Sequence, residues 1–276
     1  MKVGVFGCGR WGSFISWYLV NNGHEVIEWG RENGRAFSEL KNTGGNEYVR
    51  LDERINLTSD LEYAVKSSAV LIISIKSQAL RSLAGEIAAF GAKDKKIVLC
   101  MKGLEENTGK RLTEIMLEEG YDKNNIAVWV GPGHIQEFTA GRPNCMVIDG
   151  YNGELVRSLA DAFKSKLIRF YYGGDIIGSE VGAAAKNVMG IAAGLLDGGG
   201  YETLKGPLMA RGAREVSRLI KAMGGTELSA YGLCHLGDYE ATVFSEHSHN
   251  RRYGEAYVKG EKFDSLAEGY YTVKAI

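Results

Sequence analysis

A single lysine stands inside a long apolar stretch of the chain. Lys186 is the only charged residue between Val181 and Leu196. Gly182 and Gly190 lie one helical turn before and after it, and each costs about 1 kcal/mol relative to alanine, which suggests a surface cleared around the lysine. A lysine in such surroundings is partly desolvated, so its pKa falls and it can donate or accept a proton. We predict an acid–base group. A lysine extending from a helix edge and a small-residue helix contact are the alternatives.

The next residue, Asn187, places an amide beside this lysine. An amide there could orient the lysine or a substrate. We therefore group Asn187 with Lys186 as a candidate catalytic residue.

A glycine-rich segment near the start of the chain has the spacing of a phosphate-binding turn. Residues 7–12 read GCGRWG, follow an apolar run at 2–6 and precede a helix-like segment. In such a motif Gly7 permits a tight turn, Gly9 lets the backbone approach a pyrophosphate, and Gly12 lets helix and strand pack closely. The helix N-terminus offers free N–H groups to the phosphates. This context predicts dinucleotide binding.

The residues after the second apolar run bear on which dinucleotide is bound. NAD-binding chains carry an acidic residue there for the ribose hydroxyls. Here that position falls on Gly30, followed by Arg31. A small residue with an arginine suits a 2′-phosphate, so we expect NADP rather than NAD. Two alternatives stay open: Glu28 is the acidic residue in another register, or Arg31 is a solvated loop charge.

These residues must be positioned by two different kinds of structure. In the first half, short apolar runs alternate with amphipathic segments, which predicts a parallel sheet covered by helices on both faces. Beyond Gly173 the pattern is helical. We predict an α/β fold: a Rossmann-type dinucleotide-binding domain at 1–173 and an all-α substrate domain at 174–276. The expected strands are 2–6, 26–29, 69–75, 97–101, 126–130, 145–148 and 167–172.

Composition excludes several classes of protein. The formal net charge of the 276 residues is -1, so no general field attracts nucleic acid. The apolar stretch around Lys186 is too short and too interrupted to insert into a membrane. The four cysteines are far apart and form no CxxC pair, which argues against a zinc site or a disulfide framework and favours a reducing cytoplasm.

Further motifs complete an ordered series along the chain. After the GxGxWG loop come KGL at 102–104, GPGH at 131–134, GAAAKNV at 182–188, GD at 237–238 with Thr242, NRRYG at 250–254 and EG at 268–269. This series resembles the NAD(P)-dependent sn-glycerol-3-phosphate dehydrogenases over nearly the whole chain. The resemblance implies a cytoplasmic enzyme that reduces dihydroxyacetone phosphate to glycerol 3-phosphate, and a homodimer built through the helical half.

The resemblance also implies roles for individual residues. Lys186 would donate the proton to the carbonyl oxygen, and Lys102 would be a second lysine at the substrate and the cofactor. The other residues assigned to the substrate are Gly131, Gly133, Asp238, Thr242, Ser248, His249 and Asn250. The other residues assigned to the cofactor are Arg10, Trp11 and Glu268.

Two departures from the family pattern concern the substrate. The family's serine-arginine-asparagine segment reads Ser248-His249-Asn250 here, so an arginine that clamps phosphate is missing, and Arg251 or Arg252 could compensate. The family's glycine-proline-serine turn has become Gly131-Pro132-Gly133. One alternative is therefore a related lysine-asparagine reductase acting on another phosphorylated or acidic small ketone. A non-catalytic dinucleotide sensor is the alternative from another class.

Overall fold

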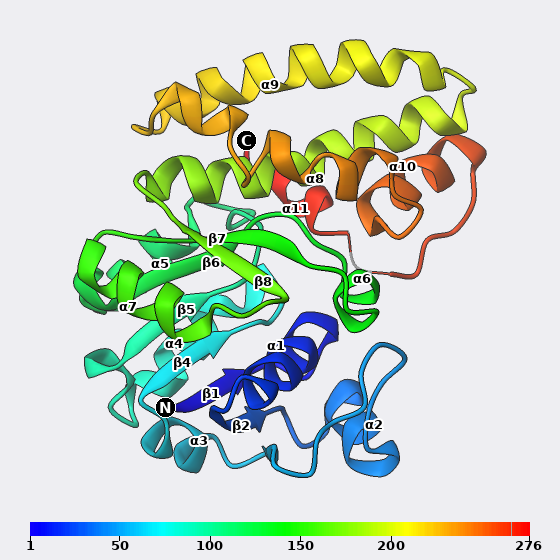
Figure 1. Ribbon diagram of the computed structural model, residues 1–276. Helices are drawn as coiled ribbons and strands as arrows, with labels where there is room; N and C mark the ends of the chain where they lie inside the picture. Colours follow the sequence, from blue (N-terminus) through cyan, green and yellow to red (C-terminus); the bar gives the residue numbers. More distant parts are fainter. Residues whose placement is uncertain (266) are drawn as a thin grey trace.

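The computed structural model describes residues 1–265 and 267–276, which form a sheet-bearing half and a layer of helices packed on it (Figure 1). One sheet has the strand order β3-β2-β1-β4-β5-β6-β7-β8. The expected α/β half followed by a helical half is confirmed. The strands are β1 (Lys2–Phe6), β2 (Glu25–Trp29), β3 (Asn56–Thr58), β4 (Val70–Ile73), β5 (Lys96–Leu99), β6 (Ile126–Val130), β7 (Asn144–Gly150) and β8 (Ile168–Tyr172).

The sheet is parallel from β3 to β6, but β7 pairs antiparallel with β6. The expectation of an entirely parallel sheet is therefore wrong at this edge. Only the short helix α6 (Ile135–Thr139) lies between β6 and β7. A parallel neighbour needs a full crossover connection, so here the chain turns back instead. β8 then pairs parallel with β7 after the helix α7 (Gly153–Phe163).

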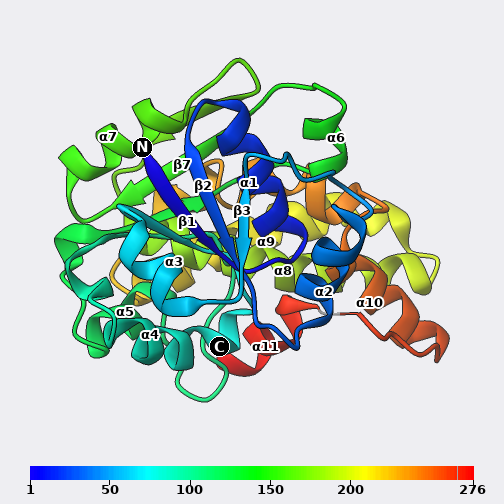
Figure 2. The same ribbon diagram turned by 90° about the horizontal axis from the view of Figure 1, so that it is seen from below.

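Helices cover both faces of the sheet, and each face has its own hydrophobic core. Val70 and Ile72 belong to one core, and Leu71 and Ile73, which alternate with them, belong to the other. The continuous apolar runs in the sequence follow from this double burial. Figure 2 shows α3, α4 and α5 on the side of the sheet away from α6 and α7. The helices are α1 (Arg10–Asn21), α2 (Arg35–Thr43), α3 (Leu61–Ser67), α4 (Leu80–Ala88) and α5 (Leu112–Glu118).

The helical half is built around one long helix, α8 (Ile176–Gly198). Its neighbours are α9 (Lys205–Ala222), α10 (His249–Lys259) and α11 (Glu268–Ala275). Among the described residues no strand follows β8. None of the helices in the described part of the chain is long and apolar enough to cross a membrane.

A buried ion pair joins the two halves. Arg111, at the start of α5, places Nη1 2.7 Å from Oε2 of Glu180 on α8, and the two side chains are 6% and 5% exposed. The Glu180 carboxylate also accepts hydrogen bonds from the backbone N–H and the hydroxyl of Thr113. Burial raises the pKa of Glu180 above its ordinary value, and Arg111 and Thr113 act in the opposite direction by favouring the charged carboxylate. The pair fixes α8 against the sheet and thereby positions Lys186.

Candidate active site

Two lysines from different halves of the chain meet on one carboxylate. Asp238 lies in a short turn (Leu236–Asp238) and is 1% exposed. Its Oδ2 is 2.6 Å from Nζ of Lys186 on α8 and 2.8 Å from Nζ of Lys102, which follows β5. Its Oδ1 is buried and has no hydrogen-bond partner among the described residues. The structure therefore brings three of the predicted residues into direct contact and leaves one acceptor atom open.

Lys186 is buried, as the sequence suggested, and Nζ also donates to Oγ1 of Thr242 at 2.8 Å. Burial lowers the pKa of Lys186 to about 8, with the Asp238 carboxylate raising it and the Lys102 amine lowering it further. A lysine with such a pKa can give up and take back a proton near neutral pH. The surroundings of Lys186 therefore desolvate it and make it suited to acid–base chemistry.

The glycines around Lys186 do not clear an open surface. A Cβ on Gly182 would lie 3.1 Å from Cβ of His235, and one on Gly190 would lie 2.8 Å from Cγ2 of Thr242. Small residues here let other segments pack closely against α8. This is the helix-contact alternative, and it coexists with the buried lysine, because the close contacts are what desolvate it.

A chain of amide hydrogen bonds connects the site. Asn187 donates from Nδ2 to the carbonyl of Lys102 at 2.8 Å. Asn250, in the first turn of α10, donates from Nδ2 to Oδ1 of Asn187 at 3.0 Å and accepts at Oδ1 from the backbone N–H of Gly269 at 2.9 Å. Asn187 therefore orients the segment that carries Lys102. It does not contact Lys186 through a hydrogen bond that the structure records.

The glycine loop has the shape that a pyrophosphate needs. Gly7 has φ +125°, and a Cβ on it would lie 2.2 Å from the carbonyl oxygen of Ser74. A Cβ on Gly12 would lie 1.7 Å from the carbonyl oxygen of Gly7, whereas one on Gly9 would meet nothing within 4 Å. No side chain caps the N-terminus of α1, and its first turn holds no acidic residue. The open space beside Gly9 and the free N–H groups at the start of α1 fit a dinucleotide pyrophosphate.

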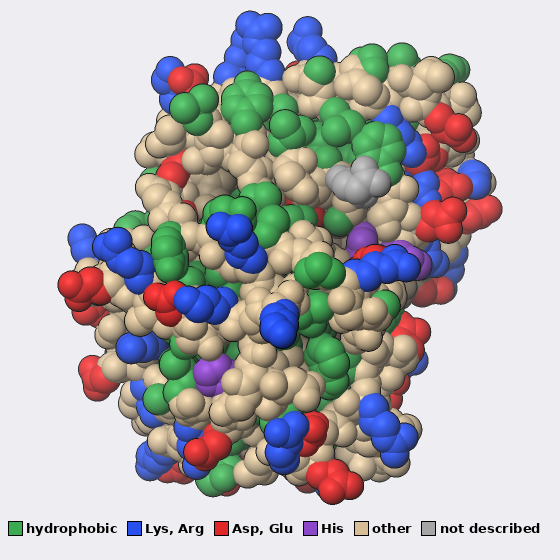
Figure 3. Space-filling view, in the orientation of Figure 1, with side chains coloured by type: hydrophobic (Ala, Val, Ile, Leu, Met, Phe, Trp, Pro, Cys, Tyr) green, Lys and Arg blue, Asp and Glu red, His purple; other side chains and the backbone are tan. Residues whose placement is uncertain are grey.

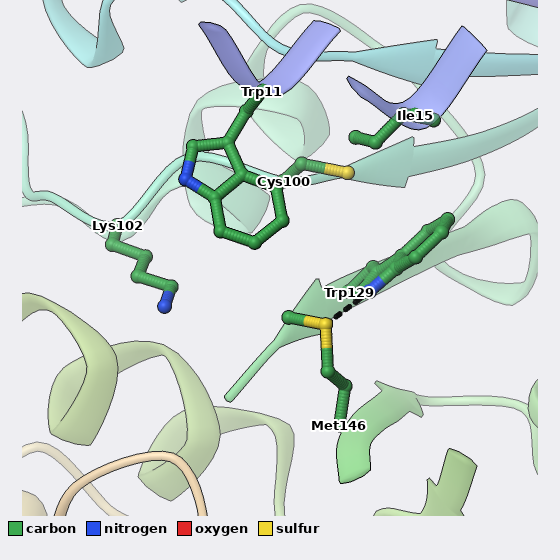
Figure 4. A pocket seen from close by; sticks show the side chains of 6 residues that line it. All are labelled: Trp11, Ile15, Cys100, Lys102, Trp129 and Met146. Atoms are coloured by element: carbon green, nitrogen blue, oxygen red, sulfur yellow. Dashed lines mark hydrogen bonds between the residues drawn. The ribbon is translucent and has the colours of Figure 1, made fainter. Parts of the chain in front are cut away.

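Trp11 links this loop to the lysines. The Lys102 amine lies 5.9 Å from the centre of the Trp11 ring. Figure 4 shows the indole beside Lys102 at a small pocket. Apolar walls of this kind exclude water and strengthen electrostatic interactions. The pocket is lined by Trp11, Ile15, Cys100, Lys102, Trp129 and Met146.

The residues at the end of β2 bear on which side chain would contact the adenosine ribose of the cofactor, Glu28 or Arg31. Glu28 is fully buried against α1, where it accepts a hydrogen bond from Oγ of Ser13, and burial raises its pKa to about 7. A fully buried carboxylate is not accessible to a ribose, which argues against the alternative based on Glu28. Arg31 follows β2 and is exposed. In the described part of the chain, no hydrogen bond or ion pair joins it to Lys102, Lys186 or Asp238. Its role at a 2′-phosphate stays a prediction.

The start of α10 departs in detail from the sequence expectation. Oγ of Ser248 accepts from the backbone N–H of Arg251 at 3.3 Å, so this hydroxyl caps the helix. His249 is contacted from the other half of the chain: Nη1 of Arg10 lies 2.5 Å from its Nε2. Arg251 is paired with Asp197 at 2.5 Å and is therefore engaged elsewhere.

Gly131, Gly133 and Glu268 are the remaining predicted residues. The carbonyl of Gly131 accepts from Nζ of Lys102 at 2.6 Å. Gly133 has φ +145°, and a Cβ on it would lie 2.4 Å from the ring of Phe138, so this backbone conformation leaves no room for a side chain. Glu268, at the start of α11, accepts from the hydroxyl of Ser77 at 2.5 Å and from its backbone N–H at 3.2 Å. Sequence reasoning missed Ser77, since nothing in its local pattern marks it.

Two histidines near the lysines also had no predicted role. His235 contacts α8 one turn before Lys186: its Nδ1 is 3.0 Å from the carbonyl of Gly182, and its Nε2 is 2.8 Å from the Tyr239 hydroxyl. His134 has a buried Nε2 without a partner among the described residues. Burial lowers the pKa of each to about 4. Both rings are neutral at pH 7, so the positive charge beside Asp238 comes from the lysines. Only His134 carried a sequence signal, its place in the GPGH turn.

Comparisons with known proteins agree with this architecture. The family model described as NAD-dependent glycerol-3-phosphate dehydrogenase N-terminus matches residues 2–156, and the corresponding C-terminus model matches residues 175–276. The chain is 36% identical over 288 aligned positions to glycerol-3-phosphate dehydrogenase (NAD(P)+) of Fusobacterium nucleatum, which covers 100% of this chain and 86% of that one. It is also 36% identical to the protein of the same name from Moorella thermoacetica, with 97% and 80% covered.

A solved structure extends the comparison to the fold. The crystal structure of glycerol-3-phosphate dehydrogenase from Coxiella burnetii superposes with a TM-score of 0.90 at 24% identity, covering 99% of this chain and 87% of that one. At this identity the likeness concerns the fold alone. From its two matched family models and its relatives over the full length, the chain belongs to the NAD-dependent glycerol-3-phosphate dehydrogenase family.

Proposed function

We propose that this protein catalyses the NAD(P)H-dependent reduction of dihydroxyacetone phosphate to sn-glycerol 3-phosphate, and the reverse oxidation. The observation that carries the proposal is the contact of Lys186 and Lys102 with one buried carboxylate, beside a glycine loop that fits a dinucleotide. A protein that only senses a dinucleotide has no use for a desolvated lysine with a pKa of about 8.

Lys186 is the proton donor in reduction and the proton acceptor in oxidation. In its charged form it donates a proton from Nζ to the carbonyl oxygen of the substrate, which becomes the new hydroxyl. In the reverse direction the neutral amine takes the hydroxyl proton. The bound nicotinamide dinucleotide supplies the hydride for reduction and accepts it for oxidation. Asp238 favours the charged amine and burial favours the neutral one, so both forms are accessible near neutral pH.

Lys102 and Asp238 prepare the place where charge develops. The ammonium group of Lys102 is held between Asp238 and the carbonyl of Gly131, so it can stabilise negative charge that grows on the substrate oxygen. The unpartnered Oδ1 of Asp238 can accept a hydrogen bond from a substrate hydroxyl. Such a hydroxyl satisfies an acceptor that is otherwise buried without a partner.

Cofactor choice and assembly are finer parts of the proposal. Arg31 after β2, with Gly30 in place of an acidic residue, supports NADP over NAD. A homodimer through the helical half is proposed from the family resemblance, and analytical ultracentrifugation tests it. The four cysteines are free in the structure, which supports a reducing compartment such as the cytoplasm.

The test is the oxidation of NADPH and of NADH by the purified protein with dihydroxyacetone phosphate. We expect rapid turnover at sub-millimolar substrate and a lower KM for NADPH. Cofactor binding with negligible turnover would reject the substrate and favour the second candidate, a reductase of another phosphorylated ketone, for which the histidine at 249 is the supporting observation. A panel of phosphorylated ketones would then identify the substrate.

A further inference from the structure

Arg10 and His249 lie next to each other although 239 positions separate them in the sequence. Arg10 opens α1, directly after the glycine loop, and His249 opens α10 in the other half. The starts of the two helices therefore lie next to each other. Figure 3 shows basic and histidine side chains gathered where the helical half meets the sheet near α6.

In the described part of the chain, the charge of Arg10 has no carboxylate to balance it. Among the described residues no acidic side chain lies within ion-pair distance of its guanidinium, and its Nε is buried without a hydrogen-bond partner. The guanidinium instead lies 5.0 Å from the centre of the Tyr48 ring. The half-buried Arg251 and the buried Arg111 each have a carboxylate partner. A partly buried guanidinium without a counterion is suited to an anionic ligand.

The contact with His249 orients Arg10 without neutralising it. A guanidinium has only donors, so Nε2 of His249 must accept and carries no proton in this contact. Through this nitrogen His249, which the resemblance assigns to the substrate, offers no positive charge to an anion. The imidazole holds Nη1 of the guanidinium at the start of α10.

We propose that Arg10 is a specificity residue that binds the phosphate of the substrate, with His249 as the residue that positions it. This inference rests on the proposed function. Arg251 is bound to Asp197 and does not supply this charge, whereas Arg10 reaches α10 from the cofactor loop. The arginine absent from position 249 of the family pattern is thus replaced from the other half of the chain. Arg10 therefore connects the glycine loop that binds the cofactor with the start of α10, where the substrate phosphate would bind.

The experiment compares Arg10→Gln with Arg54→Gln, a control that removes an exposed arginine paired with Asp52. For each holoenzyme one measures kcat and KM for dihydroxyacetone phosphate, kcat/KM for dihydroxyacetone, and the dissociation constant of NADPH. We expect Arg10→Gln to raise the KM for the phosphorylated substrate roughly ten- to a hundredfold, the range for a lost hydrogen bond to a charged group. The loss for dihydroxyacetone should be far smaller. Arg54→Gln should match the wild type.

Two results would overturn the inference. One is a KM for dihydroxyacetone phosphate that stays within twofold of the wild type in Arg10→Gln. The other is an NADPH dissociation constant that rises as much as the KM, which would assign Arg10 to the cofactor pyrophosphate. Adding His249→Arg to Arg10→Gln returns a guanidinium to the start of α10, so recovery of a low KM would support the inference.

Binding of inorganic phosphate separates this inference from the proposed function. Calorimetry on the cofactor-loaded protein, in which the pyrophosphate position is already filled, reports the second anion site directly. If the wild type fails to reduce dihydroxyacetone phosphate, the proposed function fails. Weaker phosphate binding in Arg10→Gln would still support the role of Arg10, and unchanged binding would reject it.

Discussion

Replacing Lys186 by methionine tests the centre of the proposed mechanism. Methionine keeps an unbranched side chain of similar length in a buried place but has no proton to donate. Asp238 retains its 2.8 Å contact with Lys102, so the carboxylate is not left without a partner and the fold should survive. Loss of a general acid lowers turnover by about 10²- to 10⁴-fold. We expect that loss in kcat, with the dissociation constant of NADPH nearly unchanged.

The pH dependence gives the same test a second readout. Reduction needs the protonated amine, so kcat for reduction should fall as pH rises through about 8. Oxidation of glycerol 3-phosphate needs the neutral amine, so its kcat should rise over the same range. At one pH unit above the pKa only about a tenth of the amine remains protonated. In Lys186→Met, the residual kcat should show neither the fall for reduction nor the rise for oxidation near pH 8.

The assay is steady-state NADPH oxidation or NADP reduction, with thermal unfolding to verify that the variant folds. Lys259→Met is a suitable control, because Lys259 is an exposed lysine paired with Glu255 on α10. A kcat within tenfold of the wild type in Lys186→Met would refute the assignment. The same conclusion would follow if the wild type showed identical pH profiles in both directions.

Three further predictions concern the elements that position the site. Glu180→Ala removes the buried carboxylate 2.7 Å from Nη1 of Arg111 and leaves only the partly exposed Glu114, 3.3 Å from Nε. The free energy of unfolding in urea denaturation should therefore fall by about 3 kcal/mol, the lower end for breaking a buried ion pair, and a loss below about 1 kcal/mol would contradict this. Gly12→Ala places a Cβ against the carbonyl of Gly7, so cofactor fluorescence titration should show at least about a tenfold weaker affinity, and unchanged affinity would argue against the loop as the binding site. Arg31→Ala should weaken NADPH binding far more than NADH binding, and equal losses would place the cofactor preference elsewhere.

Local pattern was sufficient for the fold because the signals were repeated along the chain. The apolar runs of the first half predicted seven of the strands near their observed positions, since strands buried on both faces must be apolar at every residue. The three-residue strand β3 was missed, because so short a segment carries no periodicity. The reversal of β7 was missed as well. Strand direction depends on how the connection packs. The apolar run at 145–148 predicts a strand but does not indicate whether it pairs parallel or antiparallel.

The sequence by itself determined which chemical groups this protein has: a glycine loop for a dinucleotide, a lysine that is the only charged residue between Val181 and Leu196, and an ordered set of family motifs. Tertiary structure decided what those groups touch. Only folding brings Asp238 to two lysines that are 84 positions apart, buries Lys186 enough to lower its pKa, and buries Glu28 against Ser13. It also sets Arg10 against His249 across 239 positions. Charge, burial and distance between residues remote in the chain are properties of packing, and no local pattern encodes them.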